Sequence, residues 1–407
     1  MKLRKSDGDQ YAHRTTKSNA DMIPLAIPNL SGNEERYLRE CVETNFVSSV
    51  GPFVGRFESM IADSTGARHV VATCSGTAGL HAALTAVGVG RDDLVILPAL
   101  TFIASANAVS YCGADPWLFD IESETWTLDA NAVRNALAGE TEKREDGLIH
   151  RASGRRVAAI MPVYTLGLPA RMSELVSVGR EFGLPVVADA AAAIGATANG
   201  ARIGELEADL SVLSFNGNKT VTTGGGGAII GNDEELCYLV RHLTTTARLG
   251  ADYTHDRVGF NYRMTNLAAA VGCAQLERLD FYVKRKRTIA TRYNAELTDL
   301  PGIGEFPNPA WAESACWFSG VTVNGPDAPP TETVIEVLRD NEFDVRPFWK
   351  PVNMQVPYAN AIRNNLDRTE GTWRTVLVLP CSTGLSDEEQ GRVVDIVSTC
   401  VKGFSSA

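Results

Sequence analysis

The chain has 407 residues, of which 44% are hydrophobic and 21% are charged. A chain of this length can form one large domain or two, and the composition is ordinary for a soluble globular protein. The formal net charge of −11 argues against general nucleic-acid binding, because no basic stripe offsets it.

The amino terminus is polar and mixed in charge, without the apolar segment of a signal peptide. We expect residues 1–22 to be a disordered tail, since they are rich in Lys, Asp, Ser and Asn. The uncharged stretch 94–114 contains Pro98 and several polar residues, so we expect no membrane span there. The scattered cysteines lack C-x-x-C spacing and indicate reduced thiols in a cytoplasmic protein, and no ligand cluster predicts a metal site.

From Ile23 onward, short β-rich runs alternate with helical patterns. This alternation predicts an α/β fold with a mainly parallel sheet that helices cover on both faces. Residues 147–158, centred on Gly154, are expected to form an inserted hairpin. The expected strands are 69–73, 94–97, 116–120, 157–163, 185–189 and 209–214, and the expected helices include 75–86, 129–138, 171–182, 233–247 and 267–292.

The pattern changes past Pro301, where shorter strands predominate. It predicts a smaller α+β domain, and we divide the chain into a large domain at 23–285 and a small one at 286–407. The elements expected after residue 301 are strands at 315–323 and 342–346, a helix at 331–340 and a closing helix from Asp387.

One lysine, Lys219, lies in the turn "SFNGNK" between two apolar segments and is followed by four glycines. A lysine that is desolvated in such a place shifts its pKa and can act as an amine nucleophile that forms a Schiff base. A lone lysine near glycines is nevertheless more often part of a solvated turn. The run is not a Walker motif, because Asn218 stands where the glycine before the lysine should be.

An acid, Asp189, ends the apolar run "LPVVAD" and would lie at the carboxyl end of a buried strand, where α/β sheets place ligands. Taken alone, it could equally cap a helix. A lysine for a Schiff base and an aspartate for a pyridinium nitrogen are the pair of groups that pyridoxal phosphate needs.

Two further stretches could serve such a cofactor. Ser75-Gly76-Thr77 opens a helix and would present unpaired amides to an anion, although a simple helix cap is an equal possibility. Phe102 follows a strand and could lie on a flat ring, although an aromatic residue there more often belongs to the core.

These residues carry a resemblance to a known family. The chain from about Ile23 to Val397 resembles the fold-type I, pyridoxal phosphate-dependent sugar aminotransferases of the DegT/StrS family, and within it the LegC-type enzymes. The matching stretches are "IPNLSGNE", "VSSVGPFV", "SGTAGLHAAL", "LTFIASANAV", "SFNGNKTVTTGGGG", "VGFNYRMTNLAAAVGCAQLE" and "RPFWKPVNMQVPY".

The resemblance implies a role for each matching residue. Lys219 would be the catalytic lysine that binds pyridoxal phosphate, and Asp189 would pair with its ring nitrogen. Phe102 would stack on the ring, while Gly76, Thr77 and Ser214 would hold the phosphate. Asn261 would reach the phosphate in a neighbouring subunit, since such enzymes form homodimers with shared sites. Arg346 would lie near the substrate.

The resemblance also implies the reaction. Members of the family transfer an amino group from L-glutamate to a nucleotide-linked keto sugar. LegC-type enzymes act on a UDP-4-keto-6-deoxy-N-acetylglucosamine type of sugar, for legionaminic acid and related surface polysaccharides. This chain departs from the pattern at Ala192, where relatives carry Gln or Glu, and at Tyr164, where many carry His. Both positions are candidate substrate contacts, and both leave the identity of the sugar open.

Other functions are compatible with parts of this pattern. A different keto sugar could be the substrate, and sugar dehydratases share the fold but resemble this chain with His in place of Lys219. A nicotinamide-dependent oxidoreductase would need a G-x-G-x-x-G after the first strand, and the chain has none. A non-catalytic regulator with a degenerate cofactor site is a further alternative.

Overall fold

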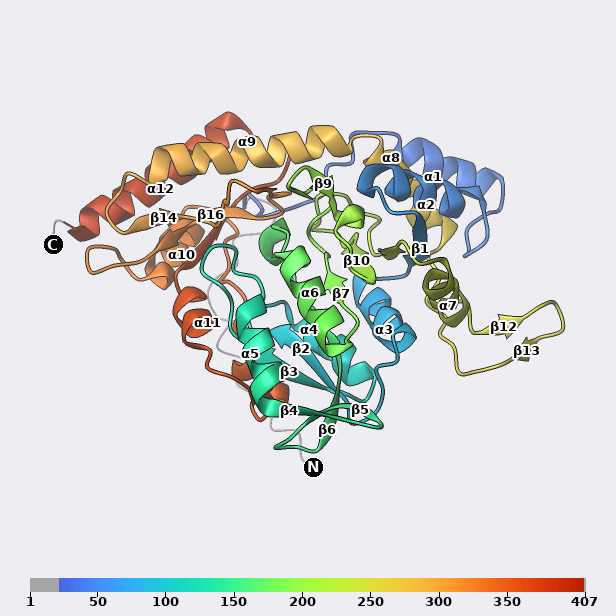
Figure 1. Cartoon of the computed structure of the whole chain (residues 1–407). Helices are drawn as coiled ribbons and strands as arrows, with labels where there is room; N and C mark the ends of the chain where they lie inside the picture. Colours follow the sequence, from blue (N-terminus) through green and yellow to red (C-terminus); the bar gives the residue numbers. More distant parts are fainter. Residues whose placement is uncertain (1–21, 406–407) are drawn as a thin grey trace, which may run out of the picture.

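The structure is a computed structural model that describes residues 22–405, so the tail expected at 1–22 lies almost wholly outside the described residues. A twisted sheet forms the centre of the larger part of the molecule (Figure 1). Parallel bridges from Ile160 to Val186 and from Val163 to Asp189 join its two halves. The strands run in the order β1 (His69–Thr73), β11 (Gly227–Gly231), β10 (Leu210–Ser214), β7 (Val187–Asp189), β6 (Arg155–Ile160), β2 (Leu94–Pro98), β3 (Asp115–Phe119) and β17 (Ile362–Arg363).

The prediction of a mainly parallel sheet is confirmed. Within this order only β11 runs antiparallel to its neighbours, β1 and β10. The pairs β10–β7, β6–β2, β2–β3 and β3–β17 are parallel. The inserted hairpin is also confirmed, because β5 (Gly147–His150) pairs antiparallel with β6, and β4 (Thr141–Arg144) adds a further strand.

Helices cover both faces of the sheet, because its central strands carry apolar side chains on both faces and each face must be shielded from water. One cluster of buried hydrophobic residues joins the sheet to α2, α5, α6 and α8, and a second joins the opposite face to α3, α4 and α7. These helices are α2 (Pro52–Thr65), α3 (Gly76–Ala86), α4 (Ile103–Tyr111), α5 (Ala130–Glu140), α6 (Met172–Phe182), α7 (Glu234–Thr244) and α8 (Asn266–Leu276), with α1 (Glu34–Glu43) packed against α8.

The C-terminal part has its own core, as expected for an α+β unit. An antiparallel sheet in the order β14 (Ile303–Glu305), β16 (Ser319–Val323) and β18 (Val376–Leu379) packs against helices. These are α9 (Leu279–Leu297), α10 (Thr331–Asp340) and α12 (Asp387–Ser405). The smaller elements are β8 (Thr197–Ala198), β9 (Ala201–Arg202), β12 (Arg248–Leu249), β13 (Thr254–His255), β15 (Ala312–Glu313) and α11 (Asp367–Thr372).

Two details differ from the sequence prediction. The long helix expected at 267–292 is two helices, because Arg278 leaves helical geometry (φ −118°, ψ 14°) between α8 and α9. The strand expected at 342–346 makes only an isolated parallel bridge, between Phe343 and Ile23, in which the Ile23 amide donates to Glu342 and the Asp344 amide donates to Ile23. Helix α9 spans residue 286, the position at which we divide the chain into two domains, so one helix connects the proposed domains.

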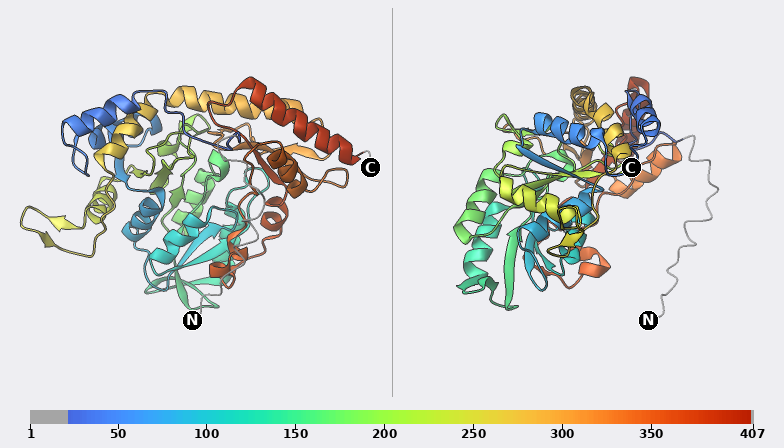
Figure 2. Two further views of the ribbon diagram at one scale, coloured as in Figure 1. Left: turned by 180° about the vertical axis from the view of Figure 1, so that it is seen from behind. Right: turned by 90° about the vertical axis from the view of Figure 1, so that its right-hand side faces the viewer.

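A hairpin arm, residues 245–258 with β12 and β13, stands away from the body in both views that show its length (Figures 1 and 2). Among residues 22–405, no helix is long and apolar enough to cross a lipid bilayer.

One glycine sets how closely α3 approaches the sheet. A Cβ at Gly227 would lie 2.6 Å from the amide nitrogen of Gly76 and from the carbonyl of Ser75, both backbone atoms that cannot swing away. The first turn of α3 therefore rests directly on β11, which brings its amide groups to the carboxyl edge of β10.

We predict that Gly227→Ala lowers the free energy of unfolding by about 1–3 kcal/mol, the usual cost of overpacking a close contact. Gly225→Ala is the matched control, because nothing lies within 4 Å of a Cβ at that position. Urea unfolding of both variants measures the difference. Equal stabilities would show that α3 can move off the sheet at little cost.

Candidate active site

A cavity of about 550 Å³ opens at the carboxyl ends of β7 and β10. Parallel neighbouring strands end at the same edge, so their terminal residues meet there. Segments from both parts of the chain line the cavity. The structure brings nine of the predicted site residues to its wall: Gly76, Thr77, Phe102, Tyr164, Asp189, Ala192, Ser214, Lys219 and Arg346.

Asp189, the last residue of β7, is only 6% exposed and is held by two hydrogen bonds. The Ser105 hydroxyl donates to Oδ2 (2.6 Å) and the Ala191 amide donates to Oδ1 (3.1 Å). Burial raises the pKa of this carboxyl, while the two hydrogen bonds and the charge of Lys219 act in the opposite direction. The arrangement gives a fixed carboxylate at the wall of the cavity.

Lys219 lies in the turn that joins β10 to β11. Its amide donates to the carbonyl of Asn216 (3.0 Å), and the Thr223 amide closes the turn on the carbonyl of Phe215 (2.9 Å). Burial lowers the pKa of Lys219 to about 7, against the opposing attraction of Asp189. Near neutral pH a large fraction of this amine is therefore uncharged and can act as a base or a nucleophile.

The N-terminus of α3 forms a cradle for an anion. The Ser75 hydroxyl caps the helix by accepting from the Ala78 amide (3.0 Å), and the amides of Gly76 and Thr77 have no carbonyl of their own helix to bond. A Cβ at Gly76 would lie 2.9 Å from Cβ of Ser214, so only glycine lets these groups meet. The amides of Gly76 and Thr77, together with the hydroxyls of Thr77 and Ser214, suit a phosphate at this helix N-terminus.

Aromatic side chains form the mouth of the cavity. Phe102 precedes α4 and is 55% exposed, with its ring centroid 6.0 Å from that of Trp349. Arg346 is exposed beside them, and its guanidinium pairs with Asp344 (3.0 Å). The mouth thus combines a free aromatic face with a cation.

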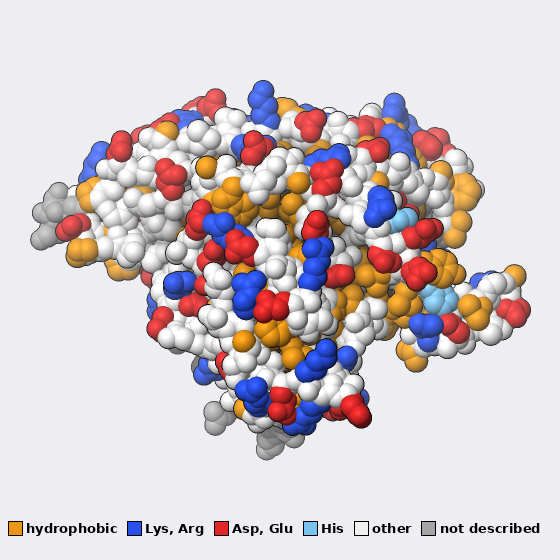
Figure 3. All heavy atoms as spheres, in the orientation of Figure 1, with side chains coloured by type: hydrophobic (Ala, Val, Ile, Leu, Met, Phe, Trp, Pro, Cys, Tyr) orange, Lys and Arg blue, Asp and Glu red, His pale blue; other side chains and the backbone are white. Residues whose placement is uncertain are grey.

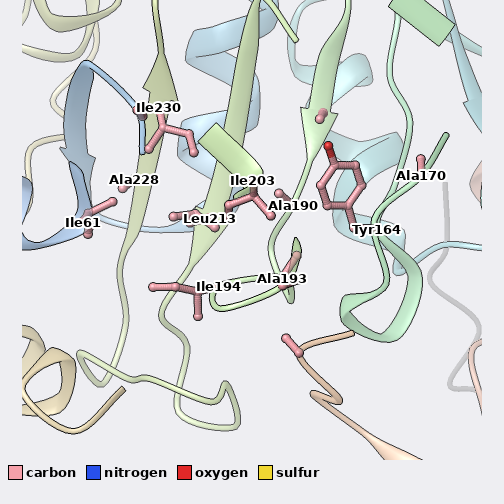
Figure 4. Packing of buried hydrophobic residues seen from close by; sticks show 14 of the residues in the cluster. Ile61, Tyr164, Ala170, Ala190, Ala193, Ile194, Ile203, Leu213, Ala228 and Ile230 are labelled. Carbon is pink, nitrogen blue, oxygen red and sulfur yellow. The ribbon is translucent and has the colours of Figure 1, made fainter. Parts of the chain in front are cut away.

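The two positions that depart from the family pattern differ in their surroundings. Ala192 is 8% exposed and lines the cavity. Tyr164 is 1% exposed and packs within the core cluster that contains Ala170, Ala190 and Ala193 (Figure 4). Its buried hydroxyl has no hydrogen-bond partner among the described residues, and burial raises its pKa.

Asn261 is the one predicted site residue that does not line this cavity. It is exposed and follows the hairpin arm, where it forms an isolated antiparallel bridge with Thr245. The sequence did not single out two residues that the structure places at the site. Ser105 is one polar residue in a helix of small residues, and Trp317 lies far along the chain, so neither gives a local signal.

These groups fit pyridoxal phosphate. The cradle at α3 suits its phosphate, and the exposed face of Phe102 suits its ring. Asp189 supplies the anion that a protonated ring nitrogen requires, and Lys219 supplies an amine of near-neutral pKa.

Known proteins of the same kind agree with this fit. Residues 28–398 match the model of the DegT/DnrJ/EryC1/StrS aminotransferase family. GDP-perosamine synthase of Caulobacter vibrioides is 37% identical over 93% of this chain and 98% of its own length. EpsN of Bacillus subtilis, named as a pyridoxal phosphate-dependent aminotransferase, is 34% identical over 92% and 95%.

A solved structure shares the fold as well. DesI, crystallised in the presence of its TDP-sugar product, superposes with a TM-score of 0.82 at 28% identity and covers 92% of this chain and 91% of its own. The protein therefore belongs to the DegT/DnrJ/EryC1/StrS family and is a pyridoxal phosphate-dependent sugar aminotransferase.

Proposed function

We propose that the protein transfers the amino group of L-glutamate to a UDP-linked 4-keto-6-deoxy-N-acetylglucosamine type of sugar, as LegC-type enzymes do, in the cytoplasm. The observation that carries the amino transfer is the presence of Lys219 and Asp189 in one cavity beside an anion cradle. Motifs that resemble LegC-type enzymes support the UDP sugar. The product would feed surface polysaccharide or legionaminic acid synthesis.

A GDP-linked keto sugar is the second candidate acceptor. It is supported by relatives named GDP-perosamine synthase in Caulobacter vibrioides, Vibrio cholerae and Escherichia coli O157:H7, which are 32–37% identical to this chain over at least 90% of its length. The two candidates share the keto group and differ in the nucleotide, so one set of substrates separates them.

In this proposal each residue has a defined task. Bound pyridoxal phosphate supplies an electron-accepting ring. Asp189 holds a proton on the ring nitrogen, and Gly76, Thr77 and Ser214 bind the phosphate. The uncharged Nζ of Lys219 would take a proton from the glutamate carbon that carries the amino group and deliver it to the cofactor, a role that a pKa of about 7 favours. Arg346 and Ala192 would face the sugar nucleotide.

We also propose that the active unit is a homodimer with shared sites. Asn261 lies outside the cavity of its own chain, and the hairpin arm beside it exposes Leu249, Tyr253 and Val258. Figure 3 shows hydrophobic side chains gathered near the base of this arm. A second copy would cover these side chains and receive Asn261 at its phosphate cradle.

Incubation with L-glutamate and a panel of UDP- and GDP-linked keto sugars tests the function. We expect wild type only to give 2-oxoglutarate and a slightly heavier sugar product, in which a hydrogen and an amino group replace the keto oxygen. Lys219→Ala should lose this transfer yet still bind the cofactor weakly. In the wild-type protein, borohydride should attach the cofactor to the peptide that contains Lys219. Attachment to another lysine would contradict the assignment of Lys219.

Ala192→Gln is included in the same panel, because it restores the polar group that relatives carry. One hydrogen bond to a neutral partner contributes about 0.5–1.5 kcal/mol, so we expect selectivity between acceptors, measured as kcat/KM, to change by about tenfold or less. Unchanged selectivity would remove position 192 from the determinants of specificity.

Mixed dimers test the shared site. Neither Lys219→Ala nor Asn261→Asp homodimers should be active, the second because a carboxylate beside a phosphate adds like-charge repulsion. Mixing the two chains should restore part of the activity, since one of the two sites in the mixed dimer carries both native residues. No recovery in mixed dimers verified by mass spectrometry would contradict the proposal.

The pKa of Lys219 predicts a pH-dependent stability in the cofactor-free chain. The unfolded state, with its lysine pKa near 10.5, binds more protons than the folded state, whose Lys219 pKa is about 7. Stability conferred through this group therefore rises with pH between about 7 and 10.5. Lys219→Met should therefore raise the free energy of unfolding above that of wild type by more at pH 7 than at pH 9.5.

Urea unfolding of wild type and Lys219→Met at the two pH values measures this gain. The exposed Lys143 provides the control, because the free energy of unfolding of Lys143→Met should differ from that of wild type by the same small amount at both pH values. A gain that is equal at pH 7 and pH 9.5 would mean that Lys219 is not desolvated.

A further inference from the structure

The indole of Trp317 lies directly against the amine of Lys219. Nζ of Lys219 is 3.5 Å from the centroid of the Trp317 ring. Trp317 belongs to the segment between β15 and β16, in the C-terminal part of the chain, whereas Lys219 belongs to the large sheet. The contact therefore joins the two parts at the reacting amine.

Trp317 is held in this position from several sides. Its indole Nε1 donates to the carbonyl of Asn218 (2.8 Å), which is the residue before Lys219. Its amide donates to the carbonyl of Leu166 (3.1 Å), and Phe318 stacks on its ring at 3.9 Å between centroids. With the side chain fixed at both ends and only 4% of the residue exposed, the ring keeps its place when the lysine moves.

A buried lysine on α9 completes the support. Nζ of Lys286 donates to the carbonyl of Trp317 (2.9 Å) and contacts Sγ of Cys381 (3.6 Å). Burying a lysine is costly, and here the interactions it makes fix the backbone of Trp317. The amine of Lys219 thus lies over the ring of Trp317, a residue whose main chain and side chain are both held by hydrogen bonds.

We propose that Trp317 is a positioning residue that holds the amine of Lys219 while that amine is free of the cofactor and carries a proton. This rests on the proposed role of Lys219. The lysine leaves the cofactor in the first half of a transamination, stays free while the cofactor carries the amino group, and returns to it at the end of the second half. The negative face of an indole attracts an ammonium by about 0.5–2 kcal/mol, most strongly where water is scarce.

The alternative partner for a released ammonium is Asp189, the charged group that acts on Lys219 in this cavity. Pairing there would compete with the proton that Asp189 holds on the ring nitrogen. By offering a neutral surface that still attracts a cation, Trp317 keeps the amine close to the reaction without engaging the carboxylate. The ring also favours the charged form of Lys219, which opposes the effect of burial.

The test uses the full-length protein loaded with pyridoxamine 5′-phosphate, which leaves Lys219 free. Competitive acetylation at a series of pH values, read by mass spectrometry of the Lys219 peptide against that of exposed Lys143, gives the pKa of Lys219. We expect Trp317→Leu to lower this pKa by about 0.4–1.5, which corresponds to the attraction lost. Trp317→Phe, which keeps an aromatic face, should lower it less.

Trp349→Leu is the matched control, because Trp349 lines the same cavity, 5.8 Å from Trp317 between ring centroids, and makes no such contact with Lys219. It should leave the pKa of Lys219 unchanged. In activity assays, Trp317→Leu should lower kcat more than it changes the affinity for pyridoxamine phosphate, and Trp317→Phe should recover part of the loss.

A second measurement avoids any effect of the substitutions on folding. Replacing the tryptophans by 5-fluoro- and then 5,7-difluorotryptophan keeps the shape of the ring while weakening its negative face, and the pKa of Lys219 should fall stepwise. A pKa that stays constant across this series, or that is equal or higher in Trp317→Leu, overturns the proposal. Cofactor attachment to a lysine other than Lys219 would instead refute its catalytic role and leave this contact unaffected.

Discussion

The carboxylate of Asp189 and the amine of Lys219 share one cavity, and the rest of the site depends on how these two groups are held. Burial favours the neutral form of both Asp189 and Lys219, while each charge favours the charged form of the other. Two hydrogen bonds keep Asp189 as a fixed acceptor, and no comparable bond fixes the amine of Lys219. This asymmetry suits a reaction in which the acid stays and the lysine moves.

The sheet order is what brings the pair together. β7 and β10 are adjacent and parallel, and Asp189 lies opposite Val212, two residues before the end of β10 at Ser214. The chain then turns back as β11, so the lysine turn sits at the edge where β7 ends. The absence of a Cβ at Gly76 and Gly227 lets α3 lie on the same edge. One antiparallel strand in a parallel sheet therefore places the acid, the amine and the anion cradle around one point.

The parts of this arrangement that depend on local patterns could be predicted. Apolar runs separated by helical patterns indicated the strands. Their residue types made Lys219, Asp189 and the α3 turn candidates, and the resemblance to the DegT/StrS family favoured them over a solvated turn or a simple helix cap. The break at Arg278 and the missing strand at 342–346 depend on packing between distant segments, which periodicity does not report. Trp317 escaped prediction for the same reason, since the fold brings it to Lys219 across 98 residues of chain.

The two departures from the family pattern carry unequal consequences for specificity. Tyr164 lies at the cavity wall with its ring packed among small core residues, and its buried hydroxyl reaches no partner among the described residues. Ala192 has no side chain beyond Cβ and also stands at the cavity wall. The small side chain of Ala192 leaves space for a water or a bulkier substituent, whereas the buried hydroxyl of Tyr164 can hydrogen-bond to a ligand. In the proposed function, position 192 therefore sets the space for a sugar substituent and position 164 offers it a polar contact.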